Sequence, residues 1–179
     1  MLQKSNRDKV LELFFDNPIP EGIGFQLREI SRKIKVAPPS VKNYLNELEK
    51  EGLIIKNKHR IHNYPVYYPN RDNEYFTFLK KIEMIKIIKG SGLLKFLSEK
   101  IMPNSIILFG SASKGEDLIN SDIDLFIQSK EKKLDLEKYE NKINRKINLF
   151  FEENFNKLSD ELKNNILNGV ILSGYIKVF

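Results

Sequence analysis

Two aspartates separated by a single residue are the strongest candidates for chemistry in this sequence. Asp122 and Asp124 lie in the segment SDIDLFI (residues 121–127), where acidic and apolar residues alternate before the segment becomes wholly apolar. Side chains two positions apart on a strand share a face, so a strand here places both carboxylates together and directs Ile123 and Leu125 into a core. Paired carboxylates favour a cation, and hard oxygen ligands suit one or two Mg²⁺ ions that carry nucleotide phosphates. The spacing therefore predicts a metal site.

A glycine-serine turn precedes these aspartates. The apolar run at 105–109 predicts a buried strand, and Gly110 and Ser111 follow it directly. Gly110 allows the backbone to approach a triphosphate closely, and Ser111, at the start of a short helix, offers a hydroxyl and free backbone N–H groups to anionic oxygens. Lys114 is a candidate for further charge stabilisation, although a plain solvent-exposed lysine explains it equally well.

The segment that contains both features resembles the polymerase beta superfamily, and within it the minimal nucleotidyltransferases. LFGSASKGEDLINSDIDLFI has their pattern of Gly-Ser, a ten-residue gap and Asp-x-Asp. The resemblance covers about residues 93–179, because the C-terminal NNILNGVILSGYIKVF looks like the helix and last strand of such domains. It implies a small mixed-sheet fold that transfers NMP from an NTP with Mg²⁺ or Mn²⁺, with Asp122 and Asp124 as catalytic metal ligands.

The third acidic residue of that family has no counterpart here. Family members carry it on the next strand, where it completes the metal site and accepts the proton of the attacking hydroxyl. The strand predicted at 145–151 has Asn148 in this position. The carbonyl oxygen of Asn148 suits a metal ion, but an amide brings no negative charge and cannot act as a base, so metal affinity and proton transfer should both be weaker. Glu152 shares this strand face about 13 Å further along, too far to replace the acid.

The N-terminal third predicts three helices and a β-hairpin. Apolar residues recur at helical spacing, prolines and Gly52 mark helix ends, and a basic stretch separates two short strands. The predicted helices span 7–16, 26–35 and about 39–51, and the predicted strands span 53–55 and 64–68. LREISRKIKVAPPSVKNYLNELEKEGLI and the closing YPVYYPN resemble winged-helix regulators over about residues 4–70.

The winged-helix resemblance implies that the third helix enters the major groove of double-stranded DNA and that the wing holds flanking phosphates. The residues nominated for DNA contact are Ser40, Lys42, Asn43, Tyr44, Lys58 and Arg60. A basic excess within 28–46 suits a phosphate backbone. The alternative is a small helical domain that packs against another protein. His59 and His62 do not suggest zinc, because the chain has neither another histidine nor a cysteine to complete a site.

A helical connector is predicted between the two parts. Apolar residues at spacings of three and four indicate an amphipathic helix over 72–89, which Gly90-Ser91-Gly92 should end, and a shorter helix over 93–101. The predicted organisation is α/β (α+β), with a winged-helix domain at 1–70, a connector at 71–92 and a nucleotidyltransferase-like domain at 93–179. In winged-helix regulators such a connector often pairs two subunits, so a homodimer is one expectation; a helix that simply covers the second domain's sheet is the other.

Composition restricts the class of protein. Hydrophobic residues make up 41% and charged residues 30% of the chain, which is typical of a folded globular protein. There is no cysteine, no apolar segment follows the first basic residues, and no run of apolar residues is long enough for a membrane span. We therefore expect a cytoplasmic protein with no membrane partner. The formal charge of +6 agrees with nucleic-acid binding.

Two functions fit these features. The first is a DNA-binding nucleotidyltransferase that transfers NMP to an unknown hydroxyl, which belongs to a protein, as in the toxin–antitoxin members of the minimal group, to an RNA end or to a small molecule. The second is a transcription regulator whose degraded site binds nucleotide without transferring it. A structural adaptor is a third hypothesis, but it leaves the adjacent Asp122 and Asp124 without a purpose.

Overall fold

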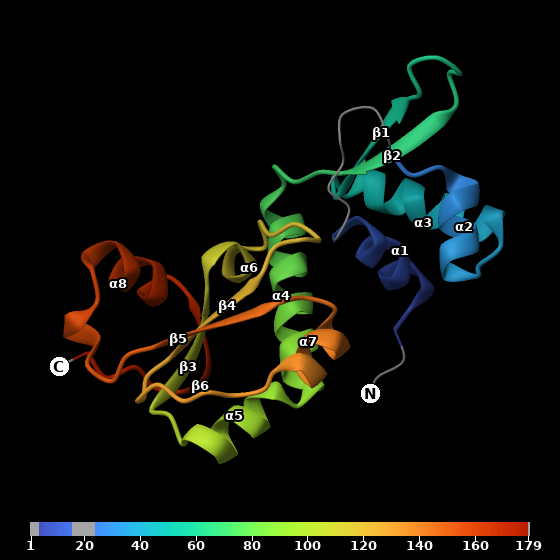
Figure 1. Ribbon diagram of the computed structural model, residues 1–179. Helices are drawn as coiled ribbons and strands as arrows, with labels where there is room; N and C mark the ends of the chain where they lie inside the picture. Colours follow the sequence, from blue (N-terminus) through green and yellow to red (C-terminus); the bar gives the residue numbers. More distant parts are fainter. Residues whose placement is uncertain (1–3, 16–23, 179) are drawn as a thin grey trace. The chain divides into compact units, whose positions relative to one another are not determined.

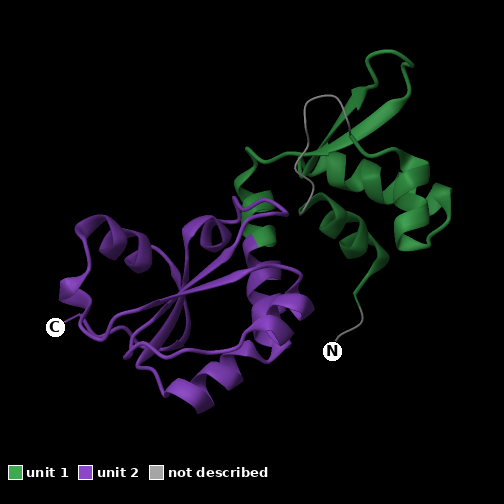
Figure 2. Cartoon of the chain, in the orientation of Figure 1, with its two compact units in different colours: residues 1–80 green, residues 81–179 purple. Residues whose placement is uncertain are grey.

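The structure is a computed structural model that describes residues 4–15 and 24–178. Its contacts divide the chain into two compact units, residues 1–80 and residues 81–179 (Figure 2). The predicted end of the first helix, at Asp16 to Pro18, lies outside the described residues. Within the described ranges, no helix is long and apolar enough to cross a membrane.

Unit 1 has the helix order and hairpin of a winged helix (Figure 1). Its elements are α1 (Asn6–Phe15), α2 (Leu27–Ile34), α3 (Pro38–Lys50), β1 (Ile54–Lys58) and β2 (Pro65–Pro69). α2 ends because Lys35 adopts a left-handed conformation and donates its N–H to the Ser31 carbonyl, and α3 begins with two prolines that suit a helix's first turn. Gly52, with φ of +73°, turns the chain from α3 into β1.

The core of unit 1 follows the apolar spacing of its three helices. α1, α2 and α3 each contribute residues of the predicted stripes, and the start of the wing closes the core. The fully buried members include Val10, Ile30, Val41, Leu45, Leu48 and Leu53. Burial of one such aliphatic side chain contributes about 1.5–3 kcal/mol. The packing therefore fixes α3 against the rest of the unit and leaves its polar face exposed.

Unit 2 is a four-stranded mixed sheet with helices on both faces. The strand order is β5-β4-β3-β6, in which β4 and β5 are parallel and β3 is antiparallel to both of its neighbours. The elements from the boundary helix onward are α4 (Glu74–Ser91), α5 (Leu93–Ile101), β3 (Ser105–Phe109), α6 (Gly110–Lys114), β4 (Ile123–Ile127), α7 (Glu137–Ile143), β5 (Ile147–Phe151), the 3-10 turn η1 (Phe155–Lys157), α8 (Asp160–Leu167) and β6 (Val170–Gly174).

Alternation along the strands divides the core of unit 2 into two layers. One face of the sheet packs against residues of α4, α5 and α7, and the other packs against Phe155 of η1 and Ile166 of α8. On β3, Ile106 and Leu108 belong to the first layer, while Ile107 belongs to the second. Both layers hold the sheet rigidly, so the ends of β3, β4 and β5 have fixed relative positions.

Several predicted boundaries differ from the structure, among them the ends of α4 and β1 and the start of β4. α4 does not stop at Gly90 but includes Gly90 and Ser91. The Ser91 hydroxyl donates to the Ile88 carbonyl and accepts from the Leu93 N–H, which supports this last turn. The helix breaks at Gly92, whose φ is +87°. β1 continues to Lys58, which pairs with Pro65, so the predicted polar tip is shorter. β4 begins at Ile123, one residue after Asp122.

Candidate nucleotide and metal site

The two predicted carboxylates lie together where β4 begins, beside the adjacent strand β5. Asp124 is on β4 and pairs in register with Asn148 of the parallel strand β5. The Asn148 Nδ2 group donates one hydrogen bond to Asp122 Oδ2 at 3.2 Å and another to Asp124 Oδ1 at 3.0 Å. The alternation that predicted a shared face is thus confirmed, although Asp122 precedes the strand. Asn148 occupies the position that the sequence predicted for it.

Gly110 lies on the other side of the same carboxylate. The last residue of β3, Phe109, pairs with Asp124, so the chain enters α6 directly beside that side chain. Gly110 has φ of +71°, and a Cβ atom there would lie 2.7 Å from Asp124 Oδ2. A side chain at this position would strain the backbone and push the Asp124 carboxylate aside. Ser111 follows and is half-buried, whereas Lys114, at the end of α6, is exposed.

The donor set of this site is acidic but incomplete. No group of three His, Cys, Asp or Glu side chains that could hold a metal occurs in the described part of the chain. Asp122 and Asp124 still offer carboxylate oxygens, and Asn148 would offer its carbonyl once the amide turns over, because its Nδ2 group now faces both carboxylates. Such oxygens are the chemistry that Mg²⁺ prefers when water and phosphate complete its shell. These residues therefore fit a divalent cation with one negative charge fewer than a three-carboxylate site.

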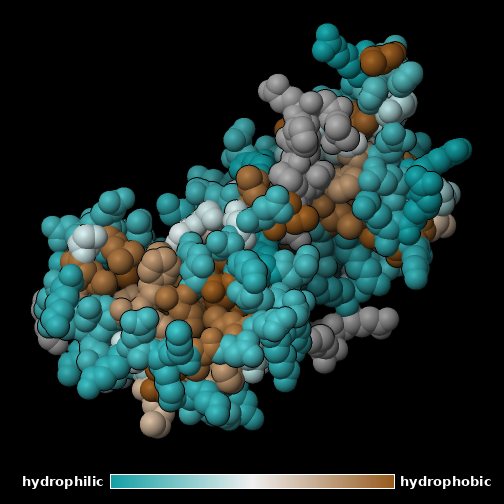
Figure 3. Space-filling model, viewed as in Figure 1, coloured by the Kyte–Doolittle hydropathy of each residue, from teal (hydrophilic) through white to brown (hydrophobic). Residues whose placement is uncertain are grey.

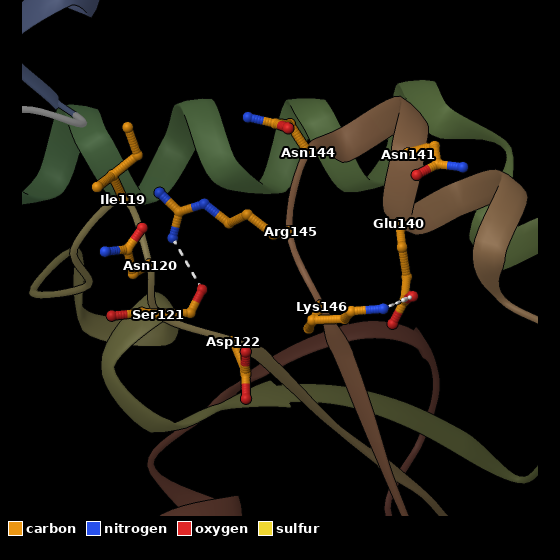
Figure 4. A pocket seen from close by; sticks show the side chains of 9 residues that line it. All are labelled: Ile119, Asn120, Ser121, Asp122, Glu140, Asn141, Asn144, Arg145 and Lys146. Atoms are coloured by element: carbon orange, nitrogen blue, oxygen red, sulfur yellow. Dashed lines mark hydrogen bonds and ion pairs between the residues drawn. The ribbon is translucent and has the colours of Figure 1, made fainter.

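A shallow cavity of about 340 Å³ opens beside Asp122 (Figure 4). It lies between the loop before β4 and the segment that leads from α7 into β5. Its lining residues are Ile119, Asn120, Ser121, Asp122, Glu140, Asn141, Asn144, Arg145 and Lys146. The lining is polar and contains no aromatic ring, so it offers hydrogen bonds rather than a stacking surface.

One wall of this cavity is held by a buried ion pair. The Arg145 Nη1 group lies 2.7 Å from Asp117 Oδ2, with side-chain exposures of 5% and 0%. The same nitrogen donates to the Ser121 carbonyl at 3.4 Å, and Figure 4 shows Arg145 reaching toward Ser121. Since Ser121 directly precedes Asp122, this pair connects the acidic loop to the beginning of β5. Sequence reasoning missed it, because nothing in the spacing joins positions 117 and 145.

A second ion pair lies at the opposite wall. Lys146 Nζ donates to Glu140 Oε2 at 2.8 Å, and the Ile147 N–H donates to Glu140 Oε1 at 3.0 Å. The hydrogen bond from Lys146 and then that from Ile147 lower the pKa of Glu140, and the Glu140 carboxylate raises the pKa of Lys146. Lys146 thus stays charged. Sequence reasoning nominated neither Lys146 nor Glu140, although Lys146 stands only two residues before Asn148.

The residues nominated for DNA contact all belong to unit 1. Lys42 and Asn43 are exposed on α3, as are Lys58 and Arg60 on the wing. Ser40 is half-buried in the first turn of α3, and Tyr44 is half-buried and packs against the core of the unit. Two basic residues that were not nominated, Arg28 and Arg32, line a cavity with Gln26, Ser31 and Pro38.

Fold and site together define a protein that joins a helix-turn-helix module to a nucleotidyltransferase sheet. Comparison with protein-family models identifies both parts: residues 91–173 match the nucleotidyltransferase domain, and residues 26–55 match a winged helix-turn-helix DNA-binding model. The suspected fusion is therefore confirmed. No curated protein and no solved structure shows a significant match to this chain.

Proposed function

We propose that this protein is a DNA-binding nucleotidyltransferase that transfers NMP from an NTP to a hydroxyl acceptor in the presence of Mg²⁺ or Mn²⁺. One observation carries the proposal: Gly110, Asp122 and Asp124 converge where β3 ends and β4 begins, and a Cβ at position 110 would lie 2.7 Å from the Asp124 carboxylate. Such a convergence has no structural purpose in a sheet, because it brings like charges together.

Each residue of the site would have a separate role in the transfer. Asp122 and Asp124 would hold the cation, with the Asn148 carbonyl as a neutral third ligand. The Gly110 backbone and the Ser111 hydroxyl would hold the triphosphate, with Lys114 at its outer end. The bound cation would supply positive charge that neutralises the phosphate oxygens. Catalysis would consist mainly of positioning and charge neutralisation.

The transfer itself is a single displacement. The acceptor oxygen forms a bond to the α-phosphorus while the bond to the bridging oxygen breaks, and pyrophosphate leaves. Asn148 cannot accept the acceptor's proton, so the proton passes to solvent. The strand order places β5 on the side of β4 opposite β3, so the cavity beside Asp122 lies opposite the triphosphate turn. This position supports entry of the acceptor through that cavity.

The test is transfer of label from α-labelled NTPs to the protein itself, to cell extract and to RNA, with Mg²⁺ or Mn²⁺. Wild type should label an acceptor, and Asp122→Ala and Asp124→Asn should lose the label. Lys95→Ala, which removes an exposed charge on α5, serves as the control and should leave labelling unchanged. Labelling that persists in both aspartate variants would refute the proposed site.

A second function is favoured by the two hydrogen bonds of Asn148. An amide that holds both carboxylates supports a site that binds NTP without transferring it, and a regulator in which nucleotide binding changes DNA affinity through α4. In this case no label would be transferred, but cation-dependent NTP binding would be lost in Asp122→Ala. Equal DNA affinity with and without NTP and Mg²⁺ would rule out the regulatory coupling.

A further inference from the structure

The wing ends in an exposed isoleucine. Ile61 is 76% exposed and stands between Arg60 and His62 in the turn that joins β1 to β2. Figure 3 shows the tip of the wing, at the top of the view, as a hydrophobic patch surrounded by hydrophilic atoms. A single exposed apolar side chain is common on protein surfaces. Ile61 differs from such a residue because hydrogen bonds and stacked rings hold the turn that carries it.

The turn that carries Ile61 is firmly hydrogen-bonded. The His59 N–H donates to the Tyr64 carbonyl at 2.8 Å, and the Asn63 N–H donates to the His59 carbonyl at 3.0 Å. The His59 Nδ1 atom accepts from the backbone N–H groups of Ile61 and His62. The chain reverses with Asn63 in a left-handed conformation. These four hydrogen bonds favour one shape of the turn.

Stacked rings lie behind this turn. The centroids of His59 and Tyr64 are 4.6 Å apart, and those of His59 and His62 are 5.3 Å apart. The Gln26 side chain donates to the Tyr64 hydroxyl at 3.1 Å, which connects the wing to the start of α2. Ile61 is also β-branched and has few rotamers, so little entropy is lost when it is confined. The tip is preorganised for insertion.

The charge around Ile61 identifies the partner. Lys56 and Lys58 share a face of β1, and Arg60 follows in the turn. No acidic residue occurs between Leu53 and Arg71 in the sequence. A basic row that ends in a rigid apolar tip is complementary to a duplex: the phosphates attract the row, and a base step accepts the tip. A purely apolar partner surface would leave these charges desolvated without compensation.

We propose that Ile61 is a wedge that enters the minor groove between two base pairs and bends the DNA to which the winged helix binds. This inference rests on the proposed DNA-binding function and adds deformation of the duplex to it. Partial unstacking by apolar side chains bends DNA by roughly 20–90° in proteins that use them. Arg60, beside the wedge, is placed to hold a phosphate that flanks the opened step. The wing would thus select sequences that unstack easily.

The test measures bending separately from affinity. The full-length protein is titrated at low salt onto a short AT-rich duplex that carries a donor and an acceptor fluorophore at its two ends. Wild type at saturation should raise the energy transfer, because a bend shortens the distance between the ends. Ile61→Ser should bind within about threefold of wild type, since phosphate contacts dominate affinity, and should lose most of the rise.

Two matched variants complete the experiment. Ile55→Ser removes another exposed isoleucine of the wing, on β1 and away from the tip, and should bend DNA like wild type. Lys58→Ala should weaken binding and reduce its salt dependence, but should reach the full bend at saturation. A straight duplex with wild type, or a full bend with Ile61→Ser, would overturn the wedge. Failure of all four proteins to bind DNA would overturn the DNA-binding function and the wedge with it.

Discussion

At the scale of single residues, Asn148 does part of what a cation would do at the aspartate pair. Its Nδ2 group donates to both carboxylates and so reduces their mutual repulsion without a metal. Hydrogen bonds to a charged group contribute about 1.5–3 kcal/mol each when they are well shielded, and less at an exposed site such as this. The amide therefore stabilises the metal-free site and competes with the cation for the same oxygens.

Asn148→Asp should reverse this preference. The variant gains a third carboxylate, so affinity for Mn²⁺ in the absence of nucleotide should rise by on the order of tenfold, and the melting temperature without metal should fall because the three carboxylates repel one another. Isothermal titration with Mn²⁺ and thermal melts measure the two effects. Asn165→Asp adds the same charge on an exposed position of α8 and should change neither. An Mn²⁺ affinity equal to wild type would show that Asn148 does not limit metal binding.

Gly110→Ala tests the close approach to Asp124. Both Gly110 and Gly92 have positive φ, but a Cβ at Gly92 meets nothing within 4 Å, whereas one at Gly110 lies 2.7 Å from Asp124 Oδ2. Each alanine should cost about 1–2 kcal/mol for the left-handed backbone. Only Gly110→Ala should also displace Asp124 and abolish NTP binding, measured by equilibrium dialysis. Intact NTP binding in Gly110→Ala would contradict the geometry of the site.

At the scale of elements, the Arg145–Asp117 pair joins the loop before β4 to the entry of β5. Removal of one member of a buried pair leaves an uncompensated charge, so Arg145→Met should lower the free energy of unfolding by about 3–5 kcal/mol. The double variant Asp117→Leu/Arg145→Met removes both charges and should recover most of this loss. Urea titrations followed by circular dichroism compare them. A double variant no more stable than Arg145→Met would show that the loss is one of packing, not charge.

The Lys146–Glu140 pair gives unit 2 a pH-dependent stability. The lowered pKa of Glu140 means that its contribution is present above the ordinary pKa of about 4.3 and is lost as pH falls through the lowered value. The raised pKa of Lys146 means that its contribution is present below about 10.4 and is lost as pH rises through the raised value. The stability advantage of wild type over Glu140→Gln should therefore be flat from about pH 5 to pH 10 and shrink on both sides.

Urea titrations at a series of pH values measure this window. Glu161→Gln, at an exposed position in the first turn of α8, removes an equal charge and leaves the Lys146 hydrogen bond intact, so it provides the control. If the stability advantage of wild type over Glu140→Gln continued to grow below pH 4, the pKa of Glu140 would not be lowered in the folded protein.

At the scale of the whole molecule, the sequence predicted the helices and strands better than the contacts between residues that are distant in the chain. The helix stripes of unit 1 and the strands at 105–109 and 121–127 follow from spacing alone, because periods of 3.6 and 2 are properties of the backbone. The position of Asn148 beside Asp124 followed from the resemblance to the nucleotidyltransferases. The Arg145–Asp117 pair joins positions 28 residues apart, which no local spacing encodes. The Lys146–Glu140 pair, although its members are six residues apart, depends on how the chain turns between α7 and β5. The extension of α4 past Gly90 depended on one side-chain hydroxyl, that of Ser91.

We also predict that the full-length chain forms a homodimer through α4. Tyr75 and Phe78 on α4 are both exposed, with ring centroids 6.2 Å apart, and offer an aromatic surface on which two copies would pair. Light scattering of wild type should give twice the mass of the chain, and Phe78→Ser should give the monomer. Lys86→Ser, at an exposed position further along the same helix, should leave the dimer intact. A monomeric mass for wild type would end the dimer hypothesis.

α4 restricts where this chain can be divided. Its residue Phe76 is buried in the core of unit 1, and its residues Met84 and Ile88 are buried in the core of unit 2. A fragment that ends before Phe76 would lack part of the first core, and a fragment that begins after Ile88 would lack part of the second. Either unit produced alone should therefore keep its own share of this helix.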